Sequence, residues 1–203
     1  MKYLLMSLAL FLVVGCSHIS NTDRQTTVQV LSEDGNASAV MVAPNRALTA
    51  AHVTRMEKLT IDGKPAKVLK VDELADVALL EVDRDCPCAT VASIPVAVDG
   101  AISMIGYPIA SVIDNKQVRV LGHFLFDLSY ANANVKRTFS IYWGFSAPGS
   151  SGGGVYNADG ELVGIISGIP SLPGTGGMFG QPQLIFNIVA AAPLEAIKAI
   201  LKE

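Results

Sequence analysis

The sequence predicts an all-β protein, and three observations support this. Many short β-like runs alternate with turn residues, Gly and Pro are abundant at 18 and 10 residues, and only one stretch has helical periodicity. Apolar residues make up 50% of the 203 residues and charged residues 16%, so the chain has enough apolar surface for a large core. About a dozen strands at a spacing of roughly 8–12 residues favour a β-sandwich or barrel.

Several of the expected strands end at a turn signal such as Asp34-Gly35-Asn36 or Asp62-Gly63. In the first half the expected strands are 26–31, 38–42, 59–61, 66–71, 77–82, 94–98 and 101–105. In the second half they are 117–128, 135–145, 154–156, 162–167 and 184–188. A helix is expected over 193–202, because Pro193 stands at its start and an apolar face follows.

The segment 107–116 divides the strands into two groups of similar size, and two small barrels with a cleft between them fit this pattern. We therefore expect an N-terminal barrel over 26–106, a linker over 107–116, a C-terminal barrel over 117–192 and a terminal helix over 193–203. Residues 168–183 are rich in Gly and Pro and are expected to form a long functional or mobile loop.

The N-terminus reads as a targeting signal over residues 1–15. Met1-Lys2 gives a positive start, and the apolar run Tyr3–Val14 is too short to cross a bilayer as a helix. The end of this run, Gly15-Cys16, resembles a bacterial lipoprotein signal, which implies a lipidated Cys16 at the start of a tether over 16–25. Export and membrane anchoring on the periplasmic or extracellular side are then expected, with ordinary secretion as the alternative.

Composition also limits the partners and cofactors. A net charge of −3 gives no sign of a nucleic-acid partner. Cys86 and Cys88 form a Cys-Pro-Cys sequence that is expected to be a turn, whether oxidised or reduced, because a Cys-x-Cys disulfide closes a very small ring. No further His or Cys lies nearby to complete a metal site, so we expect neither a metal nor another cofactor.

The stretch Ala147–Gly154 surrounds Ser151 with glycines. A nucleophilic Ser needs an exposed hydroxyl and backbone N–H groups directed at the point where an oxyanion develops, and glycines allow such a bend. A flexible Gly/Ser surface turn is the alternative interpretation.

A serine nucleophile needs a base and a group that orients the base. Among the three histidines, His52 follows an apolar strand that ends at Leu48-Thr49, whereas His18 lies in the tether and His123 within a strand. Asp76 directly precedes an apolar strand and could orient His52, while Asp72 is an alternative in what reads as an exposed turn.

Three segments, Thr49–His52, Asp76–Leu80 and Gly149–Gly153, occur in the order His, Asp, Ser and resemble the signature blocks of chymotrypsin-like serine proteases. Gly106-Tyr107-Pro108 and the C-terminal stretch from Ile185 resemble the HtrA-type bacterial branch, here without an expected PDZ module. The resemblance covers nearly all of residues 26–203.

This resemblance implies two packed six-stranded antiparallel β-barrels, with the active site between them. It implies that Ser151 attacks a peptide carbonyl, His52 acts as base and then acid, and Asp76 orients His52. The backbone N–H groups of Gly149 and Ser151 would form the oxyanion hole. Two departures from the pattern are Ser150 before the nucleophile, where digestive enzymes have Asp, and Gly154 in place of a Pro.

The resemblance also places Phe145 at the base of the specificity pocket, and Ser167, Gly168 and Ile169 along its wall. No acidic residue stands at the base, so we expect a protein or peptide substrate with a small or apolar side chain there. Trp143 is expected in the core or in a pocket wall. A catalytically inactive binding or scaffold lipoprotein and an esterase with the same triad are the alternatives.

Overall fold

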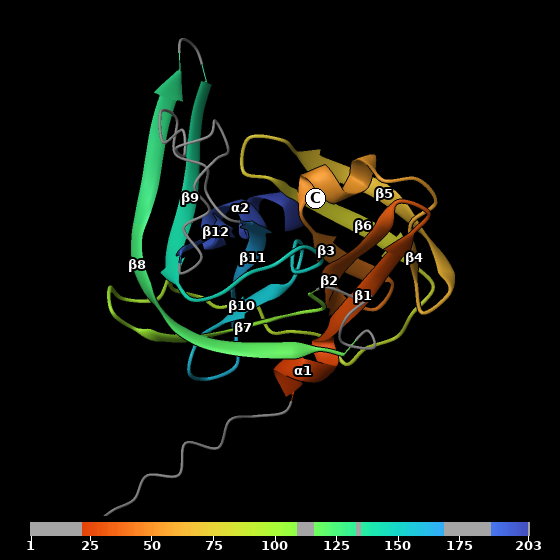
Figure 1. Cartoon of the computed structure of the whole chain (residues 1–203), viewed down its shortest axis with the longest axis horizontal. Helices are drawn as coiled ribbons and strands as arrows, with labels where there is room; N and C mark the ends of the chain where they lie inside the picture. Colours follow the sequence, from red (N-terminus) through yellow and green to blue (C-terminus); the bar gives the residue numbers. More distant parts are fainter. Residues whose placement is uncertain (1–21, 109–115, 133–134, 169–187, 203) are drawn as a thin grey trace, which may run out of the picture.

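Two closed six-stranded antiparallel barrels form the protein, as predicted (Figure 1). The computed structural model describes residues 22–108, 116–132, 135–168 and 188–202. Strand order is β1-β2-β3-β6-β5-β4 in the first barrel and β10-β11-β12-β9-β8-β7 in the second. Neighbouring strands are mostly consecutive in sequence, so most pairings join strands that follow one another along the chain.

The first barrel follows a short helix, α1 (Thr22–Thr26), and contains a 3-10 turn, η1 (Ala51–Arg55). Its strands are β1 (Thr27–Ser32), β2 (Gly35–Ala43), β3 (Arg46–Thr49), β4 (Thr60–Ile61), β5 (Lys64–Asp72) and β6 (Val77–Val82). The second barrel contains β7 (Ala101–Gly106), β8 (Val118–Asn132), β9 (Val135–Trp143), β10 (Gly154–Tyr156), β11 (Leu162–Gly168) and β12 (Ile188–Pro193). The predicted C-terminal helix is α2 (Leu194–Leu201).

The boundary between the barrels lies earlier than expected. We expected residues 101–106 in the first barrel, but β7 pairs with β8 and β10 and so belongs to the second. The expected linker 107–116 therefore joins two strands of one barrel, and residues 83–100 connect the barrels. The strand expected over 94–98 is absent from this described connector, although its residues have an apolar pattern.

The end of the expected tether is folded. Helix α1 occupies residues 22–26, and Asp23 is only 3% exposed beside the guanidinium of Arg119 on β8. The hydroxyls of Thr26 and Thr27 lie 3.0 and 2.7 Å from the buried Tyr156 hydroxyl on β10. Polar contacts to the second barrel therefore hold α1 in place, which the polar sequence alone does not reveal.

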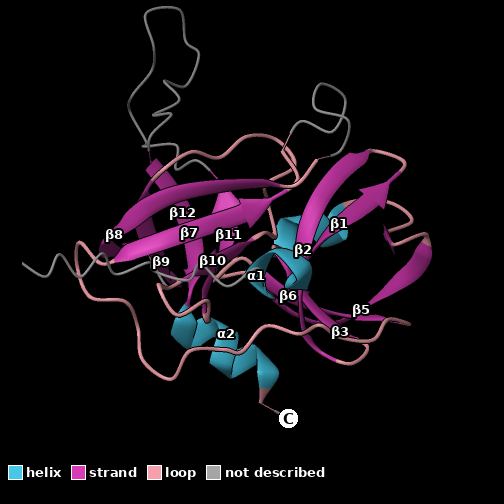
Figure 2. Cartoon of the chain, turned by 90° about the horizontal axis from the view of Figure 1, so that it is seen from below, coloured by secondary structure: helices cyan, strands magenta, loops and turns pink. Residues whose placement is uncertain are grey.

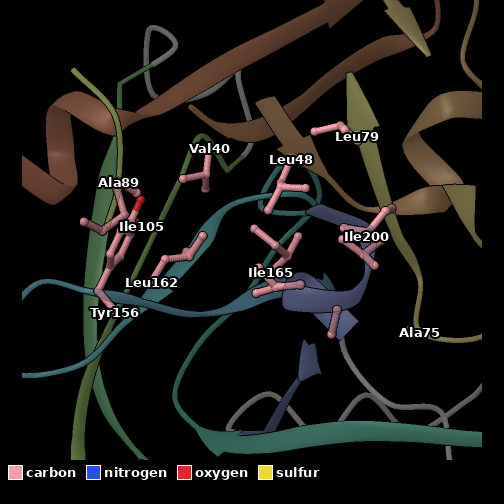
Figure 3. Packing of buried hydrophobic residues seen from close by; sticks show 13 residues of the cluster. Val40, Leu48, Ala75, Leu79, Ala89, Ile105, Tyr156, Leu162, Ile165 and Ile200 are labelled. Carbon is pink, nitrogen blue, oxygen red and sulfur yellow. The ribbon is translucent and has the colours of Figure 1, made fainter. Parts of the chain in front are cut away.

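A shared apolar core joins the two barrels (Figure 3). Val40 and Leu48 reach it from the first barrel, and Tyr156 and Ile165 from the second. Helix α2 packs its Ile197 and Ile200 side chains into the same cluster, and Figure 2 shows this helix along one side of the molecule. Because one continuous core spans both barrels, their relative position is fixed by packing.

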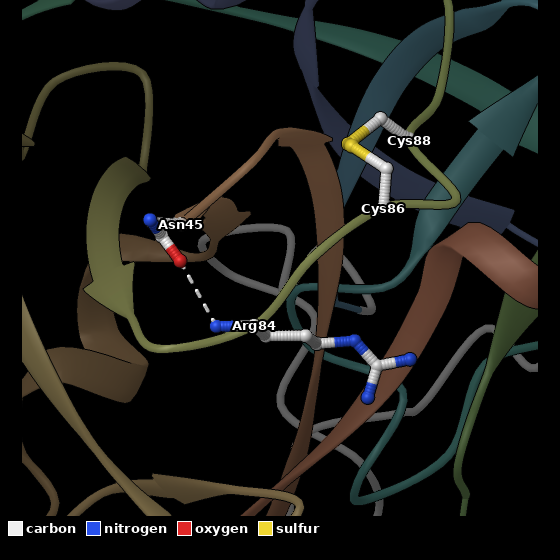
Figure 4. Close-up of a disulfide and its surroundings, with 4 residues drawn as sticks. All are labelled: Asn45, Arg84, Cys86 and Cys88. Atoms are coloured by element: carbon white, nitrogen blue, oxygen red, sulfur yellow. Dashed lines mark hydrogen bonds between the residues drawn. A yellow bond between two sulfur atoms is a disulfide. The ribbon is translucent and has the colours of Figure 1, made fainter.

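A disulfide joins Cys86 and Cys88 in the connector, with their Cα atoms 4.6 Å apart (Figure 4). The backbone N–H of the nearby Arg84 donates to the Asn45 side chain at 3.1 Å. Among the described residues, no helix is both long and apolar enough to cross a bilayer.

Candidate active site

Antiparallel pairing brings His52 and Asp76 together. Strand β3 ends where β6 begins, with Thr49 opposite Ala78. The turn η1 follows β3 and carries His52, and Asp76 directly precedes β6 with a φ of +54°. Asp tolerates this left-handed conformation better than most residues, and here it places a carboxylate beside the turn.

The His52 side chain and backbone both contact Asp76. Nδ1 of His52 lies 2.8 Å from Oδ2 and 3.1 Å from Oδ1, and the His52 backbone N–H donates to Oδ1 at 2.9 Å. Burial by itself would raise the pKa of Asp76, but hydrogen bonds from His52 and from the Ser167 hydroxyl outweigh burial and lower it from 3.8. The ionised carboxylate only accepts hydrogen bonds, so Nδ1 carries a proton and Nε2 is free to accept one.

The glycine-rich stretch forms a tight turn around Ser151. The backbone N–H of Ser150 donates to the Ala147 carbonyl and that of Gly153 to the Ser150 carbonyl, both at 2.9 Å. Within the described residues, the N–H groups of Gly149 and Ser151 donate to no protein acceptor. These two amides can therefore donate to a ligand oxygen, the chemical requirement of an oxyanion hole.

Ser167 on β11 connects Ser151 with the His52–Asp76 pair. The Ser151 hydroxyl donates to the Ser167 carbonyl oxygen at 3.2 Å, and the Ser167 hydroxyl donates to Oδ2 of Asp76. Within the described part of the chain no hydrogen bond joins Ser151 to His52, so the structure brings the predicted residues into one network without that contact.

Ser38 on β2 ties the first barrel to the turn around Ser151. Its N–H donates to the Ser151 carbonyl and its hydroxyl to the Gly149 carbonyl, both at 2.8 Å. The Tyr107 N–H donates to the same hydroxyl at 2.9 Å, and the Thr49 hydroxyl donates to the Ser38 carbonyl at 2.7 Å. Ser38 is not among the residues predicted from the sequence, where its only signal is a small polar residue within an apolar strand.

At two positions of this region a side chain would clash with its neighbours, so only glycine fits. A Cβ on Gly152, whose φ is +85°, would lie 2.0 Å from the Ser38 carbonyl oxygen and 2.2 Å from the Thr49 hydroxyl. A Cβ on Gly154 would lie 2.4 Å from the Tyr156 ring. The close Tyr156 ring thus explains why Gly154 replaces the Pro of the family pattern.

The predicted substrate-binding residues are only partly described. Phe145 is 44% exposed and lines a small apolar pocket with Met104, Pro108, Ser150 and Ile166. Gly168 ends β11, whereas Ile169, most of the expected loop 168–183 and Cys16 lie outside the described residues.

The remaining candidates have other roles. Asp72 accepts hydrogen bonds from the N–H groups of Leu74 and Ala75 at 2.9 and 3.1 Å, as expected of a turn residue. His123 stacks on Trp143, which is 46% exposed, with ring centroids 5.2 Å apart. His18 lies outside the described residues.

The part of the chain that is described contains no cluster of three His, Cys, Asp or Glu able to hold a metal ion.

Residues 37–165 match the family of trypsin-like peptidase domains. The chain belongs to this family. The match includes most of β2, His52, Asp76 and Ser151, and it ends before Ser167. No curated protein matches the sequence of this trypsin-like peptidase domain.

Solved structures share the fold of the trypsin-like peptidase domain at low sequence identity. The inactive form of the Rv3671c protease is 18% identical, covers 87% of both chains and has a TM-score of 0.70. The active form, from M. tuberculosis, is also 18% identical with a TM-score of 0.70, and covers 87% of this chain and 79% of that chain. The HtrA-type protease AlgW, solved with a tripeptide, is 23% identical, covers 90% of this chain and 63% of that chain, and has a TM-score of 0.67.

Proposed function

We propose that the protein is a serine endopeptidase in which Ser151, His52 and Asp76 form the catalytic triad. The observation that carries this proposal is the contact between His52 Nδ1 and Asp76 at 2.8 Å, with Ser167 linking that carboxylate to Ser151. This arrangement leaves Nε2 of His52 free to take the Ser151 proton. The membership in the trypsin-like peptidase family agrees with this chemistry.

The proposed reaction begins when the Ser151 hydroxyl leaves the Ser167 carbonyl and turns towards Nε2 of His52. As Ser151 attacks a peptide carbonyl, Nε2 takes the hydroxyl proton and later gives it to the leaving amine, which leaves an acyl-enzyme for water to hydrolyse. The negative charge of Asp76 stabilises the imidazolium that forms between the two transfers.

The backbone N–H groups of Gly149 and Ser151 would stabilise the oxyanion in the tetrahedral intermediate. The loss of one such donor typically costs about 2.7–4 kcal/mol of transition-state stabilisation. The apolar lining around Phe145 favours a small or apolar substrate side chain in the adjacent pocket.

Covalent labelling tests the nucleophile. A fluorophosphonate probe should label the wild type and fail to label Ser151→Ala, while the distant control Ser129→Ala should be labelled like the wild type. Equal labelling of the wild type and Ser151→Ala would contradict the proposed nucleophile.

An inactive binding protein with a protease fold is the second candidate, because the Ser151 hydroxyl is bonded to the Ser167 carbonyl and not to His52. No labelling of the folded wild type, together with no cleavage of a peptide library, would favour this candidate. A label without any peptide cleavage would point to the esterase alternative.

We also propose that Cys16 is lipidated and anchors the protein to a bacterial membrane. The sequence supports this, since Cys16 follows a short apolar run after a positively charged start. Two or three acyl chains on one Cys would give stable anchoring, whereas one chain binds only marginally. Mass spectrometry of the mature N-terminus tests the proposal, and an unmodified Cys16 would contradict it.

A further inference from the structure

Three large apolar side chains are exposed on the outer face of strands β8 and β9 of the second barrel. Leu121 is 64% exposed, Phe126 50% and Trp143 46%. Together with His123 we call these residues the outer stripe. Soluble monomers rarely gather large apolar side chains at the surface without an interaction partner.

Strand register places the four residues on one face. His123 pairs with Trp143 across β8 and β9, and their rings stack with an interplanar angle of 8°. Leu121 stands two residues before His123 along β8 and therefore shares its face. Phe126 pairs with Ile141, two residues before Trp143, because the pairing shifts register between Phe124 and Phe126. Ile141 itself is only 2% exposed, so the exposed part of this face consists of Leu121, Trp143 and Phe126 around it.

The other face of the same strands is buried. Phe124 and Tyr142 pair with each other and pack into the core of the second barrel. On the outer side, Ser103 and Ala101 of β7 lie opposite Leu121 and His123, so the neighbouring positions on this strand carry no charge. The outer stripe is consequently an apolar surface without an adjacent charge on β7.

Helix α1 lies on the same face, beside the start of the outer stripe. Arg119, two residues before Leu121, forms an ion pair with Asp23 of α1. Gln117 also donates to the Arg24 carbonyl of α1 at 2.6 Å. Figure 1 shows β8 passing α1 before it bends away along the edge of the molecule.

The chain between α1 and Cys16 is short. Even fully extended, the residues from Cys16 to Thr22 span no more than about 20 Å. A lipidated Cys16 would therefore hold α1, and the barrel face on which α1 lies, close to the bilayer.

We propose that the outer stripe docks on the surface of the lipid bilayer to which Cys16 is anchored. Leu and Phe side chains enter the boundary between headgroups and acyl chains favourably, and Trp and His rings present both an apolar body and a polar N–H to this region. The inference rests on the proposed lipidation for the proximity of the membrane, but the stripe itself is a property of the fold.

Trp143 reports this docking directly, because the chain contains a single Trp. The lipidated protein is reconstituted into vesicles of phosphatidylcholine and phosphatidylglycerol, with or without bromine on the acyl chains. We expect brominated lipids to quench Trp143 emission and the vesicles to protect it from aqueous iodide. Unchanged emission with brominated lipid and full quenching by iodide would overturn the inference.

Paired variants separate docking from anchoring. The double variant Leu121→Ser with Phe126→Ser should stay vesicle-bound through its lipid but lose the quenching by brominated lipid. Val68→Ser, at an exposed apolar position on β5 of the first barrel, should keep it. Equal quenching in the double variant and the wild type would contradict the role of the stripe.

Mass spectrometry of the same samples tests the anchor independently. If Cys16 is unmodified and brominated vesicles still quench Trp143, the stripe proposal stands and the anchor proposal fails. If Cys16 is lipidated without quenching, the anchor stands and the stripe proposal fails. Protection of Trp143 that depends on protein concentration and not on lipid would instead assign the stripe to a second copy of the chain.

Discussion

Ser38 fixes the position of the turn around Ser151 through hydrogen bonds, without itself contacting the substrate. Its hydroxyl and backbone hold the carbonyls of Gly149 and Ser151, the two residues whose N–H groups have no acceptor among the described residues and can serve an oxyanion. Because Ser38 belongs to the first barrel, these bonds set the turn around Ser151 relative to the barrel that carries His52. Ser38 is thus a positioning residue of the proposed reaction.

Ser38→Ala should lower kcat with little change in KM. The substitution leaves the Gly149 carbonyl and the Tyr107 N–H without their partner, so the Gly149 amide is less well fixed. The loss of transition-state stabilisation should be smaller than the about 2.7–4 kcal/mol caused by removal of a whole oxyanion donor. Steady-state kinetics on a cleaved peptide measures both constants.

Ser140→Ala is the matched control, because Ser140 is a buried serine that donates one hydrogen bond, to Asp127. It should lose stability and keep kcat. Equal kcat values for the wild type and Ser38→Ala would show that the Ser38 hydroxyl does not position the site.

Among the elements, α1 shows how a short polar segment gains a fixed position. Five residues are too few for a stable isolated helix, so tertiary contacts must supply the stability. These contacts are the ion pair of Asp23 with Arg119 and the hydroxyls around Tyr156. Burial raises the pKa of Tyr156 to about 12, so its hydroxyl stays protonated at neutral pH.

Tyr156→Phe should lower the free energy of unfolding by about 1–3 kcal/mol, because buried hydroxyls of Thr26 and Thr27 lose a partner. Amide exchange should also become faster in α1. Urea denaturation and hydrogen exchange measure the two effects. Thr60→Val, which removes a hydroxyl contact at an exposed edge, should change stability much less; if its effect matched that of Tyr156→Phe, the α1 contacts would have no special role.

At the scale of the whole molecule, the shared core sets the geometry of the proposed triad. His52 and Asp76 belong to the first barrel and Ser151 to the second, so their relative position depends on the packing between barrels. Leu48 on β3 is completely buried in this shared core, whereas Leu80 on the paired strand β6 is completely buried inside the first barrel.

Leu48→Ala and Leu80→Ala should each lower the free energy of unfolding by about 2–5 kcal/mol, because both leave a cavity. Only Leu48→Ala should also lower the kcat of the folded protein, since its cavity lies between the barrels. Urea denaturation followed by kinetics under conditions where both variants are folded makes the comparison. An equal loss of kcat in both variants would indicate that barrel packing does not set the site.

Much of the fold was predictable because turn chemistry and apolar runs are local. The β-runs around Asp34-Gly35 and Asp62-Gly63 became paired strands, and the apolar face after Pro193 became α2. The prediction of a strand over 94–98 was wrong because a connector can also carry an apolar pattern. The prediction of β7 in the first barrel was wrong because strand pairing is non-local. The fixed position of α1 was not predicted for the same reason, since the partners of its side chains lie far along the chain.

The sequence by itself determined the β-class, the turn positions and the residue types of the proposed triad, because these depend on spacing and local chemistry. Only the tertiary structure placed His52 beside Asp76, assigned Ser167 and Ser38 to the network around Ser151, and aligned the outer stripe with α1. Each of these depends on strand register and on contacts between barrels, which bring together residues that no local pattern relates.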